Sequence, residues 1–140
     1  VVEGTGIYNN ETSEIEFKVE NKKIDLSSVE FEKLHGDELS GSIVLDFKLK
    51  GKIDNFNYQC LVKSENIELY DVKIDGININ FSGNREQMNM PEFKINYGGN
   101  IFAAKGSIKY NPLEYQFRLY GKDVDLKVLN LLTKNKVESI

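Results

Sequence analysis

The chain of 140 residues has no tryptophan, one cysteine and one histidine, and it has no apolar run long enough to cross a membrane. A single cysteine, Cys60, can form neither an intramolecular disulfide nor a metal cluster. The only histidine, His35, has no second ligand at metal-binding spacing, which favours an exposed loop residue. The net charge of −4 excludes the basic footprint that nucleic-acid binding requires. We therefore expect no cofactor, no metal site and no nucleic-acid partner.

Recognisable catalytic motifs are also missing. The sequence contains no H-E-x-x-H, C-x-x-C, nucleophile elbow or P-loop. Its glycines, among them Gly83 and Gly106, are predicted to lie in turns between strands. The carboxylate pairs Glu14/Glu16 and Asp123/Asp125 have the i+2 spacing of a solvated strand face, whereas a glycosidase needs two carboxylates that face each other across a cleft. We predict that the protein is not an enzyme, with a β-helix lyase as a distant alternative.

Alternation of apolar and polar residues fills nearly all of the chain. Between Gly41 and Gly51, every second residue is apolar, and the pattern recurs in the runs 56–62, 77–81, 93–97 and 115–119. A period of two indicates strands with one apolar and one wet face. Cys60 lies in the apolar phase of its run and is expected to be buried. The central question is whether the apolar face is sealed as a core or left open to bind an apolar ligand.

The pattern predicts ten or more short strands that are separated by turns every 8–12 residues, which is typical of a sandwich, barrel or solenoid. We expect a polar turn at 21–23, a strand break at Ser64-Glu65 and an edge or loop segment at 88–91, since a proline cannot donate to a β-ladder. From Asp125 the period changes, and leucines at i+3 predict a short helix over 125–133.

An internal similarity bears on the architecture. Tyr58-Gln59 precedes Ile67-Glu68-Leu69 at the same interval at which Tyr115-Gln116 precedes Val124-Asp125-Leu126, and a glycine stands before each tyrosine. Such repetition favours an extended, repetitive sheet over a closed sandwich.

Two stretches resemble the TamB/AsmA-like superfamily. Residues 36–51 are similar to its "L-x-G-x-I/L-x-L-x-L-x-L-x-G" element, from Leu39 through Gly41 to Gly51. Residues 101–126 resemble a companion element with an apolar pair, a glycine, a Pro-Leu turn, an alternating strand and a closing D-V-D-L. The likeness covers roughly residues 36–132. Residues 1–35 match only as generic strands.

The resemblance implies an all-β fold: an elongated, curved antiparallel sheet that forms an open, taco-like groove, apolar inside and polar outside, with a short C-terminal helix. Residues 1–140 would be a single β-groove segment of a longer protein that is anchored in the inner membrane and crosses the periplasm. The implied function is passage of phospholipid to the outer membrane and support of outer-membrane assembly with a BamA/TamA-type barrel. Alternatives are a structural or adhesive module with a sealed core, or an LptA-like lipopolysaccharide bridge.

A lipid groove would be lined by the apolar phase of the predicted strands, and exposed strand edges would favour edge-to-edge self-association. The ligands would be phospholipid acyl chains. The predicted lining residues are Ile43, Leu45, Phe47, Leu49, Phe56, Tyr58, Val62, Ile77, Ile79, Phe81, Phe93, Ile95, Tyr115, Phe117 and Leu119.

Overall fold

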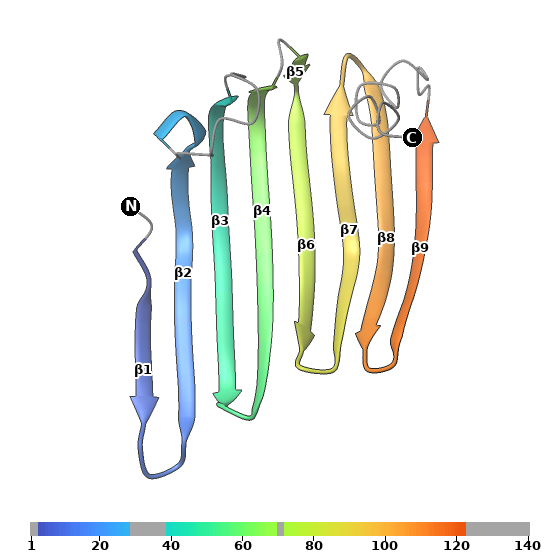
Figure 1. The fold of residues 1–140 in the computed structure, drawn as a ribbon. Coiled ribbons are helices and arrows are strands. Elements are labelled where there is room, and N and C mark those ends of the chain that lie inside the picture. Colours follow the sequence, from blue (N-terminus) through green and yellow to red (C-terminus); the bar gives the residue numbers. More distant parts are fainter. Residues whose placement is uncertain (1–2, 29–38, 70–71, 123–140) are drawn as a thin grey trace, which may run out of the picture.

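The computed structural model describes residues 3–28, 39–69 and 72–122. Within these ranges the chain forms one open antiparallel sheet of nine strands, drawn in Figure 1. The helix predicted over 125–133, the His35 loop and the Asp123/Asp125 pair lie outside the described residues. In order, the elements are β1 (Thr5–Asn9), β2 (Glu14–Asp25), the 3-10 turn η1 (Leu26–Ser28), β3 (Leu39–Lys52), β4 (Asn55–Leu69), β5 (Val72–Ile74), β6 (Gly76–Asn84), β7 (Gln87–Tyr97), β8 (Asn100–Tyr110) and β9 (Leu113–Lys122).

Neighbours along the chain are neighbours in the sheet. The order is β1-β2-β3-β4-β6-β7-β8-β9, and every pair is antiparallel. The short strand β5 pairs with the upper end of β4, and β6 pairs with the rest of it. The described strands form one layer that does not close, and the described residues include no α-helix (Figure 1). The expectation of an extended sheet in place of a closed sandwich is therefore met.

Local chemistry explains why the hairpins turn where they do. Gly98 and Gly99 both have positive φ, 52° and 79°, which matches the two-residue turn that suits the twist of antiparallel strands. At two other hairpins an asparagine side chain caps the turn. The Oδ1 atom of Asn9 accepts hydrogen bonds from the backbone of Glu11 and Thr12, at 2.9 and 3.2 Å. Asn84 does the same at the β6–β7 turn.

Three of the breaks predicted from the sequence are wrong, because the strands continue through them as β-bulges. Residues 21–23 lie inside β2, where Asn21 has a φ of 44° and the register with β3 shifts. Ser64-Glu65 lies inside β4, which runs for 15 residues. A bulge inserts one residue without ending a strand, and in a sequence it resembles a turn. The strands are accordingly fewer and longer than predicted.

The third wrong prediction concerns Met88 to Pro91, which form part of β7 with a partner strand on each side. The register shifts beside Pro91 toward both β6 and β8. A bulge removes the need for a backbone donor at that position, so an interior strand tolerates the proline.

Candidate functional site

One face of the sheet carries apolar residues across its whole width. Directly paired residues on antiparallel strands point to the same face, so the register can be followed from strand to strand. The row through Leu45 continues as Val62, Ile79, Phe93, Ala104 and Leu119 on β4, β6, β7, β8 and β9. On β2 this row ends in Lys22. We call the surface that contains this row and the rows parallel to it the apolar face.

The residues predicted to line a groove all fall on this face. Leu45 pairs with Val62, and Leu49 pairs with Tyr58, so the predicted common face of β3 and β4 is confirmed. Leu119 belongs to the row of Leu45, and Tyr115 joins the row of Tyr58 through Gly83, Met88 and Ile108. Whether these residues line a lipid path stays a prediction.

Several members of the apolar face were not among the predicted lining residues. The alternation of Ile15, Phe17 and Val19 is visible in the sequence, and these residues pair with the apolar phase of β3. Ile24 is hidden by the bulge before it. On β7 and β8 the alternating pattern is difficult to recognise in the sequence, because Pro91 interrupts it and residues 101–104 are apolar on both faces. The members of the apolar face on these strands are Met88, Met90, Phe102, Ala104 and Ile108.

The bulges keep the apolar face continuous. Between Val19 and Lys22, β2 contains one more residue than the stretch of β3 that pairs with it. Similar register shifts occur in β4 near Ser64 and in β7 near Pro91. Because the side-chain period of a strand is two, each sequence phase slip would otherwise turn the following apolar residues outward. The inserted residue absorbs the slip. The Ser64 hydroxyl, which lies in the apolar phase, is satisfied by donating to the Ser42 carbonyl.

Aromatic rings cover glycines on the adjacent strand of the apolar face. The prediction that Gly83 and Gly106 lie in turns is wrong, because they lie inside β6 and β8. Phe17 pairs with Gly6, Tyr58 with Gly83 and Phe117 with Gly106. A Cβ atom at Gly83 would lie 2.7 Å from the Tyr58 hydroxyl, and one at Gly106 would clash with the Phe117 ring. The missing side chain gives the ring room to lie flat across the neighbouring strand, as in the aromatic rescue of glycines in designed sheets.

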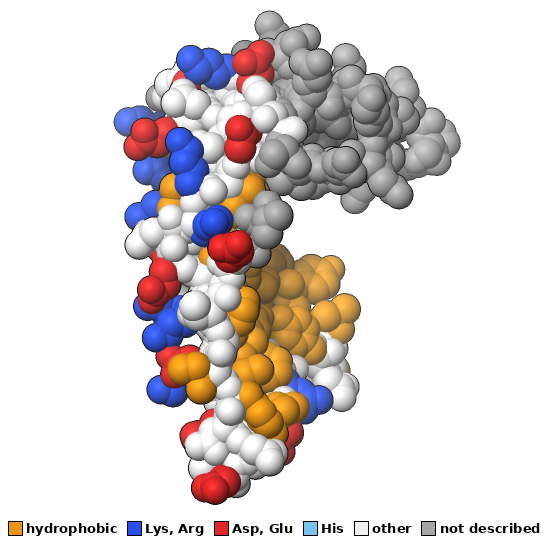
Figure 2. Space-filling model, turned by 90° about the vertical axis from the view of Figure 1, so that its left-hand side faces the viewer, with side chains coloured by type: hydrophobic (Ala, Val, Ile, Leu, Met, Phe, Trp, Pro, Cys, Tyr) orange, Lys and Arg blue, Asp and Glu red, His pale blue; other side chains and the backbone are white. Residues whose placement is uncertain are grey.

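Burial within the described residues is slight for a face of this size. Val19, Leu26, Cys60, Ile67 and Ala104 are the buried hydrophobic residues, and no described side chain is fully buried. Figure 2 shows hydrophobic side chains gathered on one side of the sheet and charged ones on the other. The seven strands from β2 to β9 along the sheet order and five rows span roughly 30 by 30 Å, or about 900 Å². The largest apolar patch on a typical monomer is about 300–600 Å².

Two tyrosines meet across this face. The Tyr58 and Tyr110 hydroxyl oxygens are 3.1 Å apart, although β6 and β7 separate their strands. Burial, followed by the hydrogen bond to Tyr110, raises the pKa of Tyr58 to about 12. The Cys60 thiol is buried, as predicted, and burial raises its pKa as well. A thiol with a raised pKa is a weak nucleophile, so Cys60 is suited to packing.

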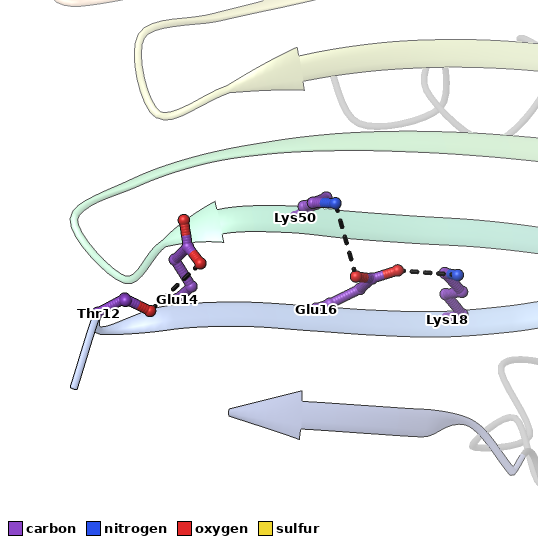
Figure 3. Close-up of polar contacts among 5 residues, drawn as sticks. All are labelled: Thr12, Glu14, Glu16, Lys18 and Lys50. Atoms are coloured by element: carbon purple, nitrogen blue, oxygen red, sulfur yellow. Dashed lines mark hydrogen bonds and ion pairs between the residues drawn. The ribbon is translucent and has the colours of Figure 1, made fainter. Parts of the chain in front are cut away.

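The opposite face is solvated and charged. Glu16 on β2 forms ion pairs with Lys18, at 2.8 Å, and with Lys50 on β3, at 3.7 Å (Figure 3). The hydrogen bond and charge of Lys18 hold the pKa of Glu16 below its ordinary value. Glu14 accepts a hydrogen bond from Thr12 at 3.2 Å (Figure 3). Glu14 and Glu16 pair with Lys52 and Lys50 of β3, so this carboxylate pair lies on the outer face. These contacts are typical of a wet strand surface.

The described residues offer no other obvious site. They contain no group of three or more His, Cys, Asp or Glu side chains that is placed to hold a metal ion. No helix among them is long and apolar enough to span a membrane. Comparisons with protein-family models, with curated proteins and with solved structures find no match for this chain. The apolar face is therefore the feature on which a functional hypothesis has to rest.

Proposed function

We propose that the apolar face binds lipid acyl chains, and that the chain is a segment of a TamB/AsmA-like protein that guides phospholipid between membranes. The observation that supports this is the breadth of the face. Its central side chains, such as Phe47 and Ile79, remain partly exposed, and the apolar rows run from β2 to β9. Moving such an apolar surface from water into contact with alkyl chains is favourable.

The energetics suit transport along the sheet better than tight binding at one point. Each methylene that moves from water onto apolar surroundings gains about 0.8 kcal/mol. Apolar rows repeated on successive strands offer similar surroundings at each step, without a deep pocket that would hold one molecule. In the proposed protein the sheet curves into an open groove with its polar face outward. Curvature of this kind is assisted by β-bulges, which β2, β4 and β7 all contain.

The cellular setting in this proposal rests on the sequence resemblance at residues 36–51 and 101–126. It comprises an inner-membrane anchor in the parent protein, a periplasmic location, a BamA/TamA-type barrel partner and a role in outer-membrane assembly. A structural or adhesive module with a sealed apolar face, and an LptA-like lipopolysaccharide bridge, are the competing functions.

Charges placed on the apolar face test the proposal. We expect Phe47→Arg and Ile79→Glu to fold but to lose lipid, because in an open groove the new charge still reaches water. In a sealed core the same charge would be buried without a partner at a cost of several kcal/mol, a large part of a total stability of about 5–15 kcal/mol. Gln59→Glu is the matched control, since Gln59 is exposed on the outer face of β4.

The measurement has two parts. Thermal unfolding reports whether each variant folds, and a photo-crosslinking residue at position 47 or 59 reports contact with added phospholipid. We expect crosslinking at 47 and not at 59. Unfolding of both charged variants, together with no crosslink at 47, would remove the proposal and leave the sealed structural module.

A further inference from the structure

Four of the five described tyrosines on the apolar face lie at one end of the strands. Tyr58 and Tyr115 belong to a single row, which pairs Leu49, Tyr58, Gly83, Met88, Ile108 and Tyr115 in turn. Tyr8 and Tyr110 lie in the next row toward the hairpins that join β1 to β2 and β8 to β9. We call these two rows the tyrosine rows. They border the hairpin end that is at the bottom of Figure 1.

Above the tyrosine rows the same face is nearly pure hydrocarbon. The three rows through Phe47, Leu45 and Ile43 contain one charge among the described residues, Lys22 at the β2 margin, and one hydroxyl, that of Ser64, which already has a partner. We call these the hydrocarbon rows. Tyr97 and Asn100 lie beyond them at the opposite end. Other members of the hydrocarbon rows are Val62, Ile77, Ile79, Phe81, Phe93, Ile95 and Phe102.

The Tyr58–Tyr110 pair gives the tyrosine rows a defined polar group. Its two oxygens are 3.1 Å apart and lie over strands whose own side chains on this face are apolar or absent. Gly83 makes the contact possible, because a side chain there would occupy the place of the Tyr58 hydroxyl. One of the two hydroxyl protons is used within the pair, so the other proton and free lone pairs remain for a ligand.

We propose that the apolar face orients its lipid, with the polar headgroup at the tyrosine rows and the acyl chains lying along the strands over the hydrocarbon rows. This inference rests on the proposed function and states how the lipid is oriented on the apolar face. Tyrosine suits the boundary between headgroup and acyl chains because its ring is apolar and its hydroxyl forms hydrogen bonds. Membrane proteins place tyrosine at the headgroup level for the same reason.

The dimensions of the rows fit a single leaflet. Rows on one face are two residues apart, or about 6.7 Å, so the three steps from Tyr58 to the row of Ile77 and Ile95 span about 20 Å. The hydrocarbon of one leaflet is about 15 Å thick, half of a bilayer core of about 30 Å. The hydrocarbon rows are thus long enough for an acyl chain, and together with the tyrosine rows they match the polarity of an amphiphile laid parallel to the strands.

A pair of positions on one strand tests the orientation. Met88 and Ile95 are both on the apolar face of β7, the first in a tyrosine row and the second in a hydrocarbon row. In a Cys60→Ala background, Met88→Cys or Ile95→Cys provides a single thiol for a fluorescent label. The probe is phosphatidylcholine that carries a nitroxide quencher either on the headgroup or at the far end of the acyl chain.

We expect the headgroup nitroxide to quench the label at position 88 more strongly, and the chain-end nitroxide to quench the label at 95 more strongly. The double variant Tyr58→Phe/Tyr110→Phe, which keeps both rings, should reduce this difference. Equal quenching by both lipids, the reversed pattern, or an unchanged difference in the double variant would overturn the orientation and leave the proposed function intact. No quenching by either lipid, or a face-to-face dimer that lipid does not dissociate, would overturn both.

Discussion

Strands β4 and β9 have the same alternating pattern but differ widely in exposure. On β4, Cys60 is 5% exposed, whereas on β9 Tyr115 is 74% and Leu119 is 68% exposed. Both strands direct these residues to the apolar face. β4 has partners on both sides, and β9 pairs only with β8 among the described strands. The apolar side chains compared here are thus less exposed on a strand with two partners than on β9, and we expect them to contribute more to stability there.

The largest expected effect is the loss of a glycine between interior strands. In Gly83→Val the new side chain would meet the backbone of Gln87 and Met88 and the Tyr58 hydroxyl. Overpacking of this kind costs about 1–3 kcal/mol, and we expect the upper end because backbone atoms cannot rotate away. Urea unfolding measures the change.

Gly99 provides the control for this prediction. It lies in a hairpin with a φ of 79°, and a Cβ atom there meets nothing within 4 Å. Gly99→Asn should therefore cost much less than Gly83→Val, because asparagine tolerates the left-handed region. Similar losses for the two variants would show that the interior strands are loosely packed, contrary to the comparison drawn above.

Ring truncation should separate interior from edge more directly. Phe47 on β3 contacts the Phe17 ring at 6.1 Å between centroids, while Phe117 on β9 is 43% exposed. Full burial of a phenylalanine is worth about 3–5 kcal/mol, so we expect Phe47→Ala to cost about 2–3 kcal/mol and Phe117→Ala about 1 kcal/mol. Equal costs in urea unfolding would indicate that β9 is covered on the apolar face as fully as β3.

The contact between Tyr58 on β4 and Tyr110 on β8 can be tested by titrating the Tyr58 hydroxyl. The pKa of Tyr58, about 12, exceeds the ordinary value of 10, so the protonated form is favoured in the folded state. The stability that this contributes is fully present below pH 10 and is lost as the pH rises from 10 to 12. Tyr110→Phe should lower the Tyr58 pKa, although burial, the larger cause, will keep it raised. Tyrosinate absorbance, with Tyr58→Phe as the reference, checks both values.

The smallest effect is expected on the outer face of the interior strands. Glu16 and Lys50 bridge β2 and β3, but their side chains are 34% and 78% exposed. Exposed ion pairs contribute little because water and salt screen them. Glu16→Gln should leave the thermal midpoint unchanged at physiological salt. A clear drop in that midpoint would mean that the outer face also stabilises the interior strands, in addition to burial on the apolar face.

The sequence predicted the class of fold and the membership of the apolar face better than the strand boundaries. The two-residue period of a strand was enough to predict that Ile43, Leu45 and Phe47 share one face, and the structure confirms this. The boundaries at Asn21 and Pro91 failed, because a bulge and a turn share the same residue preferences. Only pairing with a neighbouring strand distinguishes them.

By itself, the sequence determined that the chain forms strands with one apolar and one polar face, since side-chain period is a local property of an extended backbone. It also determined the hairpin turns at Asn9, Asn84 and Gly98-Gly99 through local hydrogen bonding and positive φ. The tertiary structure alone decided the register, and the register brings Tyr58 onto Gly83 and into contact with Tyr110, 52 residues away. Such contacts depend on which strands become neighbours, and that is fixed by pairing across the sheet rather than by any local preference.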